Sequence, residues 1–374
     1  FIITSATKRM MPILAYSETG NYNINGTNPE GLKSWQTETV KAIETAIALP
    51  HDSTKAYRMM WRQYEEPASF LPISSSTNSS YYPEFQAAQA IMQDSMMSWI
   101  NKGYEIYSME DDITGDPAKN EEIRETVYGG IDPRLMDYWD ILSFAVYRED
   151  PYVETVDNFV YSTWDQVDGY DDAFPPIGDR EHAYAGCGPV AVGQVMRYYQ
   201  YPPYFNWSAM PLNAPSRTTS NFLYDIAETS DATYKESGTE TYIDKLCSTL
   251  KIFGYNDNME YAAHDAQRTW QLIEQQIPVI MSGSTNSLSN GHAWIATGGK
   301  YVRPRTVLEV YTFANLQQYL PIIREYEDFP YPTYYFYMNW GWNGYSNGFF
   351  ADSYLCVPGY PVATNRTNIY DITY

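Results

Sequence analysis

Residues 183–202 read AYAGCGPVAVGQVMRYYQYP and place one cysteine, Cys187, between two glycines and just before a proline. Gly186 and Gly188 permit a tight turn, and Pro189 suits the first turn of a helix. The small apolar residues that follow predict a buried helix. A thiol at a helix N-terminus feels the positive end of the helix dipole, which lowers its pKa and favours the reactive thiolate. Cys187 is therefore a candidate nucleophile, although a free cysteine is more often simply buried.

The composition narrows the classes of partner. The 374-residue chain has 24 basic and 46 acidic side chains, a formal net charge of −22. This charge argues against nucleic acid or an anionic membrane as a partner, because both are bound through basic patches. No stretch approaches the roughly 18 continuous apolar residues of a membrane span. The three cysteines and four histidines lack metal-ligand spacing, so we expect no metal, no cofactor and no disulfide framework.

Hydrophobic periodicity predicts an α+β organisation, because helices precede antiparallel-looking strands in the second half. The predicted helices are 31–48, 84–104, 132–147, the segment after Cys187, 239–255 and 268–276, and the predicted strands are 277–284, 292–302, 333–342 and 348–354. Residues 1–20 read as strand, turn and strand. The acidic stretch 110–122 reads as a loop.

A histidine and a glutamine lie in contexts that suit catalysis with Cys187. His292 begins a predicted strand within NGHAWIATGG, residues 290–299, where an imidazole can serve as general base. Gln166, within YSTWDQVDGY, can direct its amide N–H at a developing oxyanion beside the backbone N–H of Cys187.

A third group follows in YMNWGWNGYSNGFF, residues 337–350. The amide of Asn339 can fix the tautomer of the imidazole, and Trp340 can shield that contact from water. Taken singly, each of these residues has an ordinary structural explanation. Their order along the chain, Gln, Cys, His and Asn, is the order found in papain-like thiol peptidases.

The same segments carry a resemblance to a known family. GCGPVAVGQVMRYYQYP, NGHAWIATGG and YMNWGWNGYSNGFF resemble the signature segments of the streptopain family of bacterial secreted cysteine peptidases. FIITSATKRMMPILAYSETG, residues 1–20, resembles the inhibitory propeptide of that family. The resemblance implies a papain-like cysteine proteinase fold, with a helical layer and an antiparallel sheet, preceded by an α+β pro-region. It implies a propeptide-like region at 1–150, of which 1–48 is family-like and 50–150 is a long insertion or linker, and a peptidase domain at 151–374.

The resemblance also implies roles. Cys187 becomes the nucleophile, His292 the general base and then acid, and Gln166 the oxyanion donor. Asn339 and Trp340 orient and cover the imidazole. The residues implied on the substrate side are Ser237, Gly238, Thr239 and Gly291. The implied partners are protein or peptide substrates and the chain's own propeptide as inhibitor, and the implied location is secreted or at the cell surface. The chain starts at Phe1 rather than Met, which favours a processed protein.

Three functions fit these observations. The first is a cysteine endopeptidase, in zymogen form. The second is a papain-like acyltransferase or amidase that uses the same thioester. The third is a catalytically silent surface-binding protein, which the 37 tyrosines would suit. Among the other candidates we expect Cys247 and Cys356 to pack in the core, and His51, His182 and His264 to be solvated.

Overall fold

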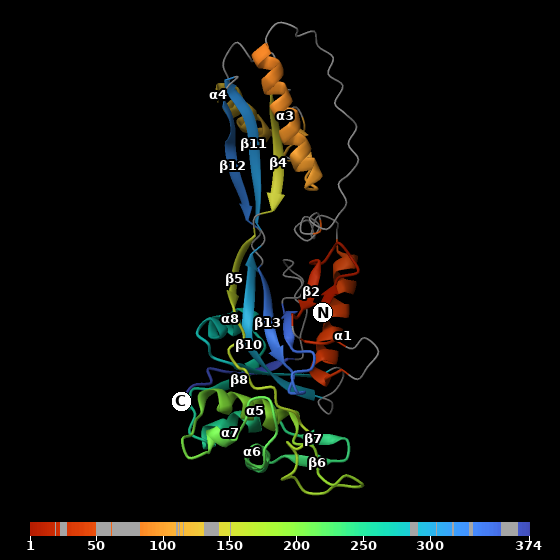
Figure 1. Ribbon diagram of the computed structural model, residues 1–374, viewed down its shortest axis with the longest axis vertical. Coiled ribbons are helices and arrows are strands. Elements are labelled where there is room, and N and C mark those ends of the chain that lie inside the picture. Colours follow the sequence, from red (N-terminus) through yellow and green to blue (C-terminus); the bar gives the residue numbers. More distant parts are fainter. Residues whose placement is uncertain are drawn as a thin grey trace. The chain divides into compact units, whose positions relative to one another are not determined.

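The computed structural model describes residues 1–18, 20–22, 28–49, 61, 83–109, 111, 113–114, 116–130, 142–149, 151–284, 291–303, 305–315, 318–328, 332–352 and 366–374. The chain forms two compact units (Figure 1). The first contains Phe1–Thr54, Val153–Val302 and Pro332–Tyr374, and the second contains Lys55–Tyr152 and Arg303–Tyr331. The division expected at residue 150 lies beside one crossing between the units. The units do not follow the order of the chain, because residues 1–54 belong to the first unit and residues 303–331 to the second. The functional division at residue 150 stays a prediction.

The first unit is organised around a nine-stranded sheet of order β1-β2-β14-β13-β10-β9-β15-β8, with β5 also paired to β10. Its strands are β1 (Ile2–Thr4), β2 (Ile13–Tyr16), β5 (Tyr152–Val156), β8 (Glu260–Ala263), β9 (Val279–Ser284), β10 (Gly291–Arg303), β13 (Thr333–Asn339), β14 (Gly348–Ala351) and β15 (Thr367–Tyr370). The pairings of β10 with β9 and β13 are antiparallel. A separate hairpin joins β6 (Thr233–Lys235) to β7 (Gly238–Glu240).

Helices cover this sheet and complete the α+β class expected from the sequence. They are α1 (Glu30–Ala48), α5 (Cys187–Tyr199), α6 (Arg217–Thr229), α7 (Ile243–Ile252), α8 (Ala266–Glu274) and the 3-10 turn η4 (Trp207–Ala209). The α5 helix packs against α6 and α7, and α1 packs against β9. Local capping sets two of the boundaries: the side chain of Ser216 accepts the N–H of Thr219 before α6, and that of Asp265 accepts the N–H of Arg268 before α8.

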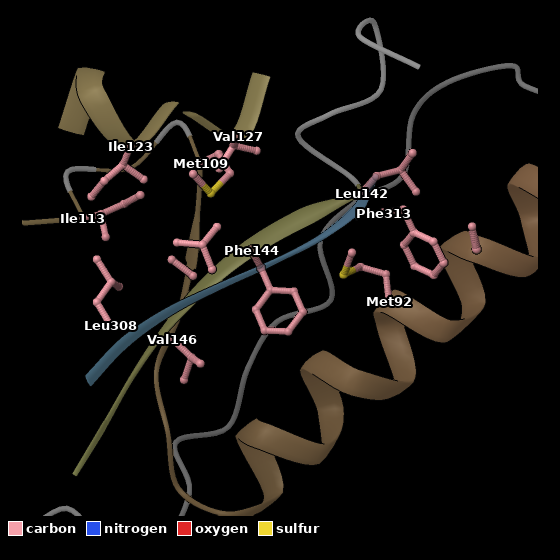
Figure 2. Close-up of a cluster of buried hydrophobic side chains, with 13 residues drawn as sticks. Met92, Met109, Ile113, Ile123, Val127, Leu142, Phe144, Val146, Leu308 and Phe313 are labelled. Atoms are coloured by element: carbon pink, nitrogen blue, oxygen red, sulfur yellow. The ribbon is translucent and has the colours of Figure 1, made fainter. Parts of the chain in front are cut away.

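The described part of the second unit contains a four-stranded antiparallel sheet of order β12-β11-β4-β3 together with helices. Its elements are α3 (Pro83–Asn101), β3 (Ile106–Ser108), α4 (Pro117–Gly130), β4 (Ser143–Glu149), β11 (Arg305–Asn315) and β12 (Gln318–Asp328). Figure 2 shows the core of this unit, with Met92 projecting from α3, Phe144 and Val146 from β4, and Phe313 from β11.

Two expected elements are wrong, both in the second unit. The stretch expected as a loop over 110–122 becomes helical at Pro117, because Asp116 accepts the N–H of Ala118 at 2.9 Å and proline suits a first helical turn. The helix expected over 132–147 is instead the strand β4 from Ser143 onward. Phe144, Val146 and Tyr147 suit a strand, and β11, a partner distant in sequence, supplies the ladder that stabilises it. Within the described residues, no helix has both the length and the apolar character to cross a membrane.

Candidate active site

The turn before α5 brings Cys187 to the N-terminus of a buried helix, as its sequence predicts. Gly186 has φ +90°, which favours glycine, and a Cβ there would lie 3.0 Å from Cβ of Thr239. A Cβ on Gly188 would meet Oγ1 of Thr241 at 2.1 Å. The small residues flanking the thiol therefore admit both a left-handed turn and the close approach of the segment that follows β7.

The structure brings the imidazole of His292 to this thiol. His292 is the second residue of β10, opposite Gly283 of β9, and its imidazole lies close enough to the thiol of Cys187 to lower the pKa of that thiol. The backbone N–H of Ala293 also donates to Sγ of Cys187, at 3.4 Å. Two residues 105 positions apart in the sequence therefore meet because a strand of the sheet faces the start of α5.

These contacts set the protonation of the thiol. Burial alone would raise the pKa of Cys187, but the charge of the His292 imidazolium and the hydrogen bond from that side chain outweigh burial. The N–H groups of Ala293 and Gly188 add to the effect, so the pKa of Cys187 lies below its ordinary value. The arrangement favours a thiolate–imidazolium pair, the form needed for nucleophilic attack on a carbonyl carbon.

The second nitrogen of the imidazole is held by the backbone. Nε2 of His292 lies 2.9 Å from the carbonyl oxygen of Trp340, so Nε2–H donates and Nδ1 is the nitrogen left for the thiol. The ring is almost fully buried, and it lies parallel to Trp294 with centroids 6.3 Å apart. The Trp340 side chain is also buried, with Nε1–H donated to the carbonyl of Ser346 at 3.0 Å.

Asn339 requires a correction, because its side chain is engaged elsewhere. Its Nδ2 donates to the carbonyl of Ser162 at 2.7 Å and to Oε1 of Gln194 at 3.0 Å, and its Oδ1 accepts the N–H of Gly341 at 3.1 Å. The amide therefore shapes the turn that presents the carbonyl of Trp340, and it acts on the imidazole only through that turn. Sequence reasoning missed Gln194, although a glutamine inside the apolar run VAVGQV was a visible signal.

Gln166 lies beside the chain segment that leads into Cys187. Its carbonyl accepts the N–H of Ala185 at 2.9 Å, two residues before Cys187. Its own N–H is bonded to Oδ1 of Asp165 at 2.6 Å, and the residue is half-buried. The backbone pairing thus fixes Gln166 next to the turn of the thiol, the neighbourhood that an oxyanion donor requires.

The implied substrate-side residues divide into exposed and engaged groups. Ser237 is exposed at the tip of the β6–β7 hairpin. Thr239 is buried, and its hydroxyl donates to the carbonyl of Tyr184 at 2.5 Å, so it supports the wall beside Gly186. Gly291 is exposed at the start of β10, one residue before the imidazole.

Helix α1 reaches the same imidazole. A Cβ added at Gly31 would lie 2.7 Å from Cδ2 of His292 and 2.8 Å from the six-membered ring of Trp340. Further along α1, Nε1–H of Trp35 donates to the carbonyl of Ala351 at 2.8 Å. The sequence marked this segment as a helix, but nothing local indicated that its first turn lies beside the imidazole of His292.

A buried charged cluster fastens α1 to the sheet edge. Arg366 is ion-paired with Glu38 of α1 at 3.2 Å and with Asp352, and all three side chains are buried. Asp352 in turn accepts Nε2–H of His264 at 2.6 Å, while Nδ1 of His264 accepts the amide of Asn368 at 2.9 Å. The expectation that His264 is solvated is wrong, because the strand pairing of β15 with β8 encloses it.

The remaining candidates play structural roles where they are described. Cys247 is buried on α7, as expected. The Nδ1 atom of His182 lies 2.9 Å from the carbonyl of Phe174, in a half-buried loop. His51 and Cys356 fall outside the described residues. In the described part of the chain, no three His, Cys, Asp or Glu side chains gather as metal ligands.

Comparison with known proteins places the chain among cysteine peptidases. The Peptidase C10 family model matches residues 164–204 and 203–350, and the model of the Spi protease inhibitor matches residues 1–43. A thiol protease/hemagglutinin, PrtT, of Porphyromonas gingivalis is 24% identical over 310 residues, which are 71% of this chain. The chain spans 30% of the length of that relative.

Two solved structures from Prevotella intermedia are similar. One is a prointerpain A fragment, with 15% identity and a TM-score of 0.49 over 99% of this chain and 91% of that one. The other is the active wild-type interpain A cysteine protease, with 18% identity and a TM-score of 0.41 over 58% and 94%. The family match covers half of the 374 residues, including the segments of the thiol, the imidazole and the Asn-Trp turn. The chain belongs to the peptidase C10 family.

Proposed function

We propose that this chain is a cysteine endopeptidase in zymogen form, acting on protein substrates, with residues 1–48 as its inhibitor. The observation that carries the proposal is that β10 meets the start of α5: the N–H of Ala293 donates to Sγ of Cys187 at 3.4 Å, and the neighbouring His292 imidazole lowers the pKa of the thiol. Membership of a peptidase family supports the same chemistry. The pairing favours an active enzyme over a silent binding protein, since a relic thiol has no need of an oriented imidazole. A secreted or cell-surface location belongs to the same proposal, supported by the resemblance to secreted peptidases.

The proposed reaction has two halves. The thiolate of Cys187 attacks the carbonyl carbon of the scissile bond, and the resulting oxyanion accepts hydrogen bonds from the backbone N–H of Cys187 and the amide of Gln166. His292 gives its proton to the leaving amine. A water molecule then attacks the thioester while His292 takes a proton from it, and the acid product leaves with the thiolate restored.

Three contacts support an inhibitory role for residues 1–48. The β2 strand extends the peptidase sheet beside β14, where Tyr16 pairs with Phe349. Glu38 is ion-paired with Arg366 within the buried cluster. In the chain between these two contacts, Gly31 in the first turn of α1 lies against the imidazole of His292. The helix therefore covers one side of the proposed catalytic pair. The match of residues 1–43 to a protease inhibitor model agrees with this role.

Mass spectrometry of the purified chain incubated alone tests the proposal. We expect the chain to cleave itself between about residues 100 and 155 and then to cleave casein, while the Cys187→Ala chain does neither. Cys247→Ala is the matched control, because this thiol is buried on α7 away from the proposed chemistry, and it should behave as the unchanged chain. Equal cleavage by the Cys187→Ala chain would refute the proposal.

A further inference from the structure

The second unit is assembled from two stretches that are far apart in the sequence. Most of its described elements, α3, β3, α4 and β4, lie before residue 150, in the region proposed above to precede the peptidase. The remaining two strands, β11 and β12, form a hairpin inserted between β10 and β13 of the peptidase sheet. The pro-region and the peptidase therefore share one small domain.

The core of this domain cannot be divided between the two stretches. The first stretch supplies Ala88, Met92, Met109, Ile113, Ile123, Val127, Leu142, Phe144, Ala145 and Val146, and the hairpin supplies Leu308, Val310 and Phe313. All of these side chains are at most 4% exposed. Figure 2 shows Phe144 and Phe313 on the side of the strands that faces Met92 of α3, and Leu308 on the other side, near Ile113, so the hairpin packs against the first stretch on both faces of the sheet. Separation of the stretches would expose both sets of apolar side chains to water.

The backbone joins the stretches as firmly as the side chains do. The β4 strand pairs with β11 over seven consecutive positions, from Ser143 opposite Thr312 to Glu149 opposite Thr306. The hydroxyls of Ser143 and Thr312 are hydrogen-bonded at the buried end of this ladder, and the Phe144 ring stacks on Tyr311 with centroids 5.2 Å apart. Without β4, the strand β11 would become an edge strand with unpaired backbone groups.

A cut between β4 and β5 breaks none of these contacts. The β4 strand pairs with β3 and β11, whereas β5, which follows it after a short connection, pairs with β10 of the other sheet. We propose that residues 83–149 stay bound to the β11–β12 hairpin after cleavage, so that the mature enzyme is a two-chain protein. This inference rests on the proposed function, in which the chain is matured by proteolysis. It separates the pro-region into an inhibitory part that leaves, residues 1–48, and a part that remains as a permanent second chain.

The experiment uses the full Cys187→Ala chain, with recognition sequences for an unrelated site-specific protease inserted between α1 and α3 and between β4 and β5. After complete cutting, the C-terminal fragment is captured through a C-terminal tag and washed in native buffer. We expect the fragment that contains residues 83–149 to be retained at close to one copy per C-terminal fragment, and to be released by denaturant. Its loss during native washing would overturn the proposal. Because Cys187 is absent and the cutting protease is external, a lack of peptidase activity in the natural chain would leave this result unaffected.

Adjacent residues on α3 provide a matched pair of variants. Met92 is 1% exposed within the shared core, whereas Ile91 is 49% exposed on the opposite face. Met92→Asp should reduce retention of the fragment at least several-fold, and Ile91→Asp should leave it unchanged. Leu308→Ala, a milder change on the hairpin side, should speed dissociation several-fold in a unit that still folds. Equal retention of all three variants, or equal loss with Ile91→Asp, would show that the shared core does not hold the fragments together.

Discussion

Gly31 of α1 and His292 of β10 are in direct contact, and the contact exists only because residue 31 has no side chain. A Cβ at this position would lie 2.7 Å from Cδ2 of the imidazole, closer than the 3.0 Å that real Cβ atoms respect. The first turn of α1 therefore lies close against the imidazole of His292. Any larger residue must displace either the helix or the imidazole.

We expect Gly31→Ala to loosen α1 from the sheet. Hydrogen–deuterium exchange of the α1 amides in the Cys187→Ala chain should rise several-fold, because local opening becomes easier. Gly129→Ala in α4 is the matched control, since no atom lies within 4 Å of a Cβ built there. If the exchange of the α1 amides were unchanged in the Gly31→Ala chain, Gly31 would not be the residue through which the proposed inhibitor contacts His292.

The oxyanion role of Gln166 leads to a kinetic expectation. Gln166→Ala should lower kcat on a peptide substrate about 10²- to 10³-fold with little change in KM, because the amide binds the charge that develops only in the transition state. Gln275→Ala, on an exposed helix end, should have no effect. A rise in KM with unchanged kcat would instead make Gln166 a residue of ordinary substrate binding.

Alkylation rates should separate the two described cysteines. The pKa of Cys187 is lowered from its ordinary value of 9.0, so its reaction with iodoacetamide should persist as the pH falls below 9. Burial raises the pKa of Cys247, which should react slowly and only at more alkaline pH. His292→Ala should remove the advantage of Cys187 at neutral pH. Peptide mass spectrometry across a pH series measures both rates, and parallel profiles would contradict the thiolate–imidazolium pair.

We expect Asn339 to act as a positioning residue, and variants of its hydrogen-bond partner Gln194 should behave like variants of Asn339. Asn339→Ala and Gln194→Ala each remove buried hydrogen bonds behind the Trp340 turn, at a cost of about 1–3 kcal/mol in the free energy of unfolding. Both variants should lower kcat by a similar factor. The pH dependence of kcat that reports on His292 should be the same in the two variants. A shift of that pH dependence in the Asn339→Ala enzyme alone would restore the direct contact with the imidazole expected from the sequence.

The buried cluster around His264 should make stability depend on pH. Burial and the charge of Arg366 lower the pKa of His264 from its ordinary 6.5, despite the opposing effect of Asp352. The unfolded chain binds a proton at His264 below about pH 6.5 and the folded chain does not, so stability is lost as the pH falls from 6.5 towards the lower folded pKa. We expect the Tm to fall over this range, and to fall less in His264→Gln. His182→Gln, in a half-buried loop, is the control.

The candidate nucleophile and its candidate imidazole could be predicted from the sequence because each lies in a local pattern that limits its structure. The glycines around Cys187 predict a turn before a helix, and the apolar run after His292 predicts a strand. The acceptor for the imidazole could not be found in this way, because it is a backbone carbonyl, that of Trp340, and any residue supplies one. The contact of Gly31 was hidden for a related reason: within a helix pattern a glycine reads only as a weak position.

The second unit marks where sequence reasoning fails most clearly. The β4 strand was expected as a helix, and the hairpin of β11 and β12 was not expected at all. The hairpin of β11 and β12 is local in sequence, but β4 forms its seven-residue ladder with β11, whose paired residues lie 157 to 169 positions away. Local propensity cannot anticipate a ladder that closes over such a separation.

The place of β14 in its sheet has a consequence for handling the mature enzyme. In the intact chain β14 is flanked by β13 on one side and by β2 on the other. Loss of residues 1–48 would turn it into a terminal strand whose amide and carbonyl groups, at Phe349 and its neighbours, face solvent. An exposed edge strand can pair with any extended polypeptide, so removal of residues 1–48 would give the protein a tendency to self-associate that the uncut chain lacks.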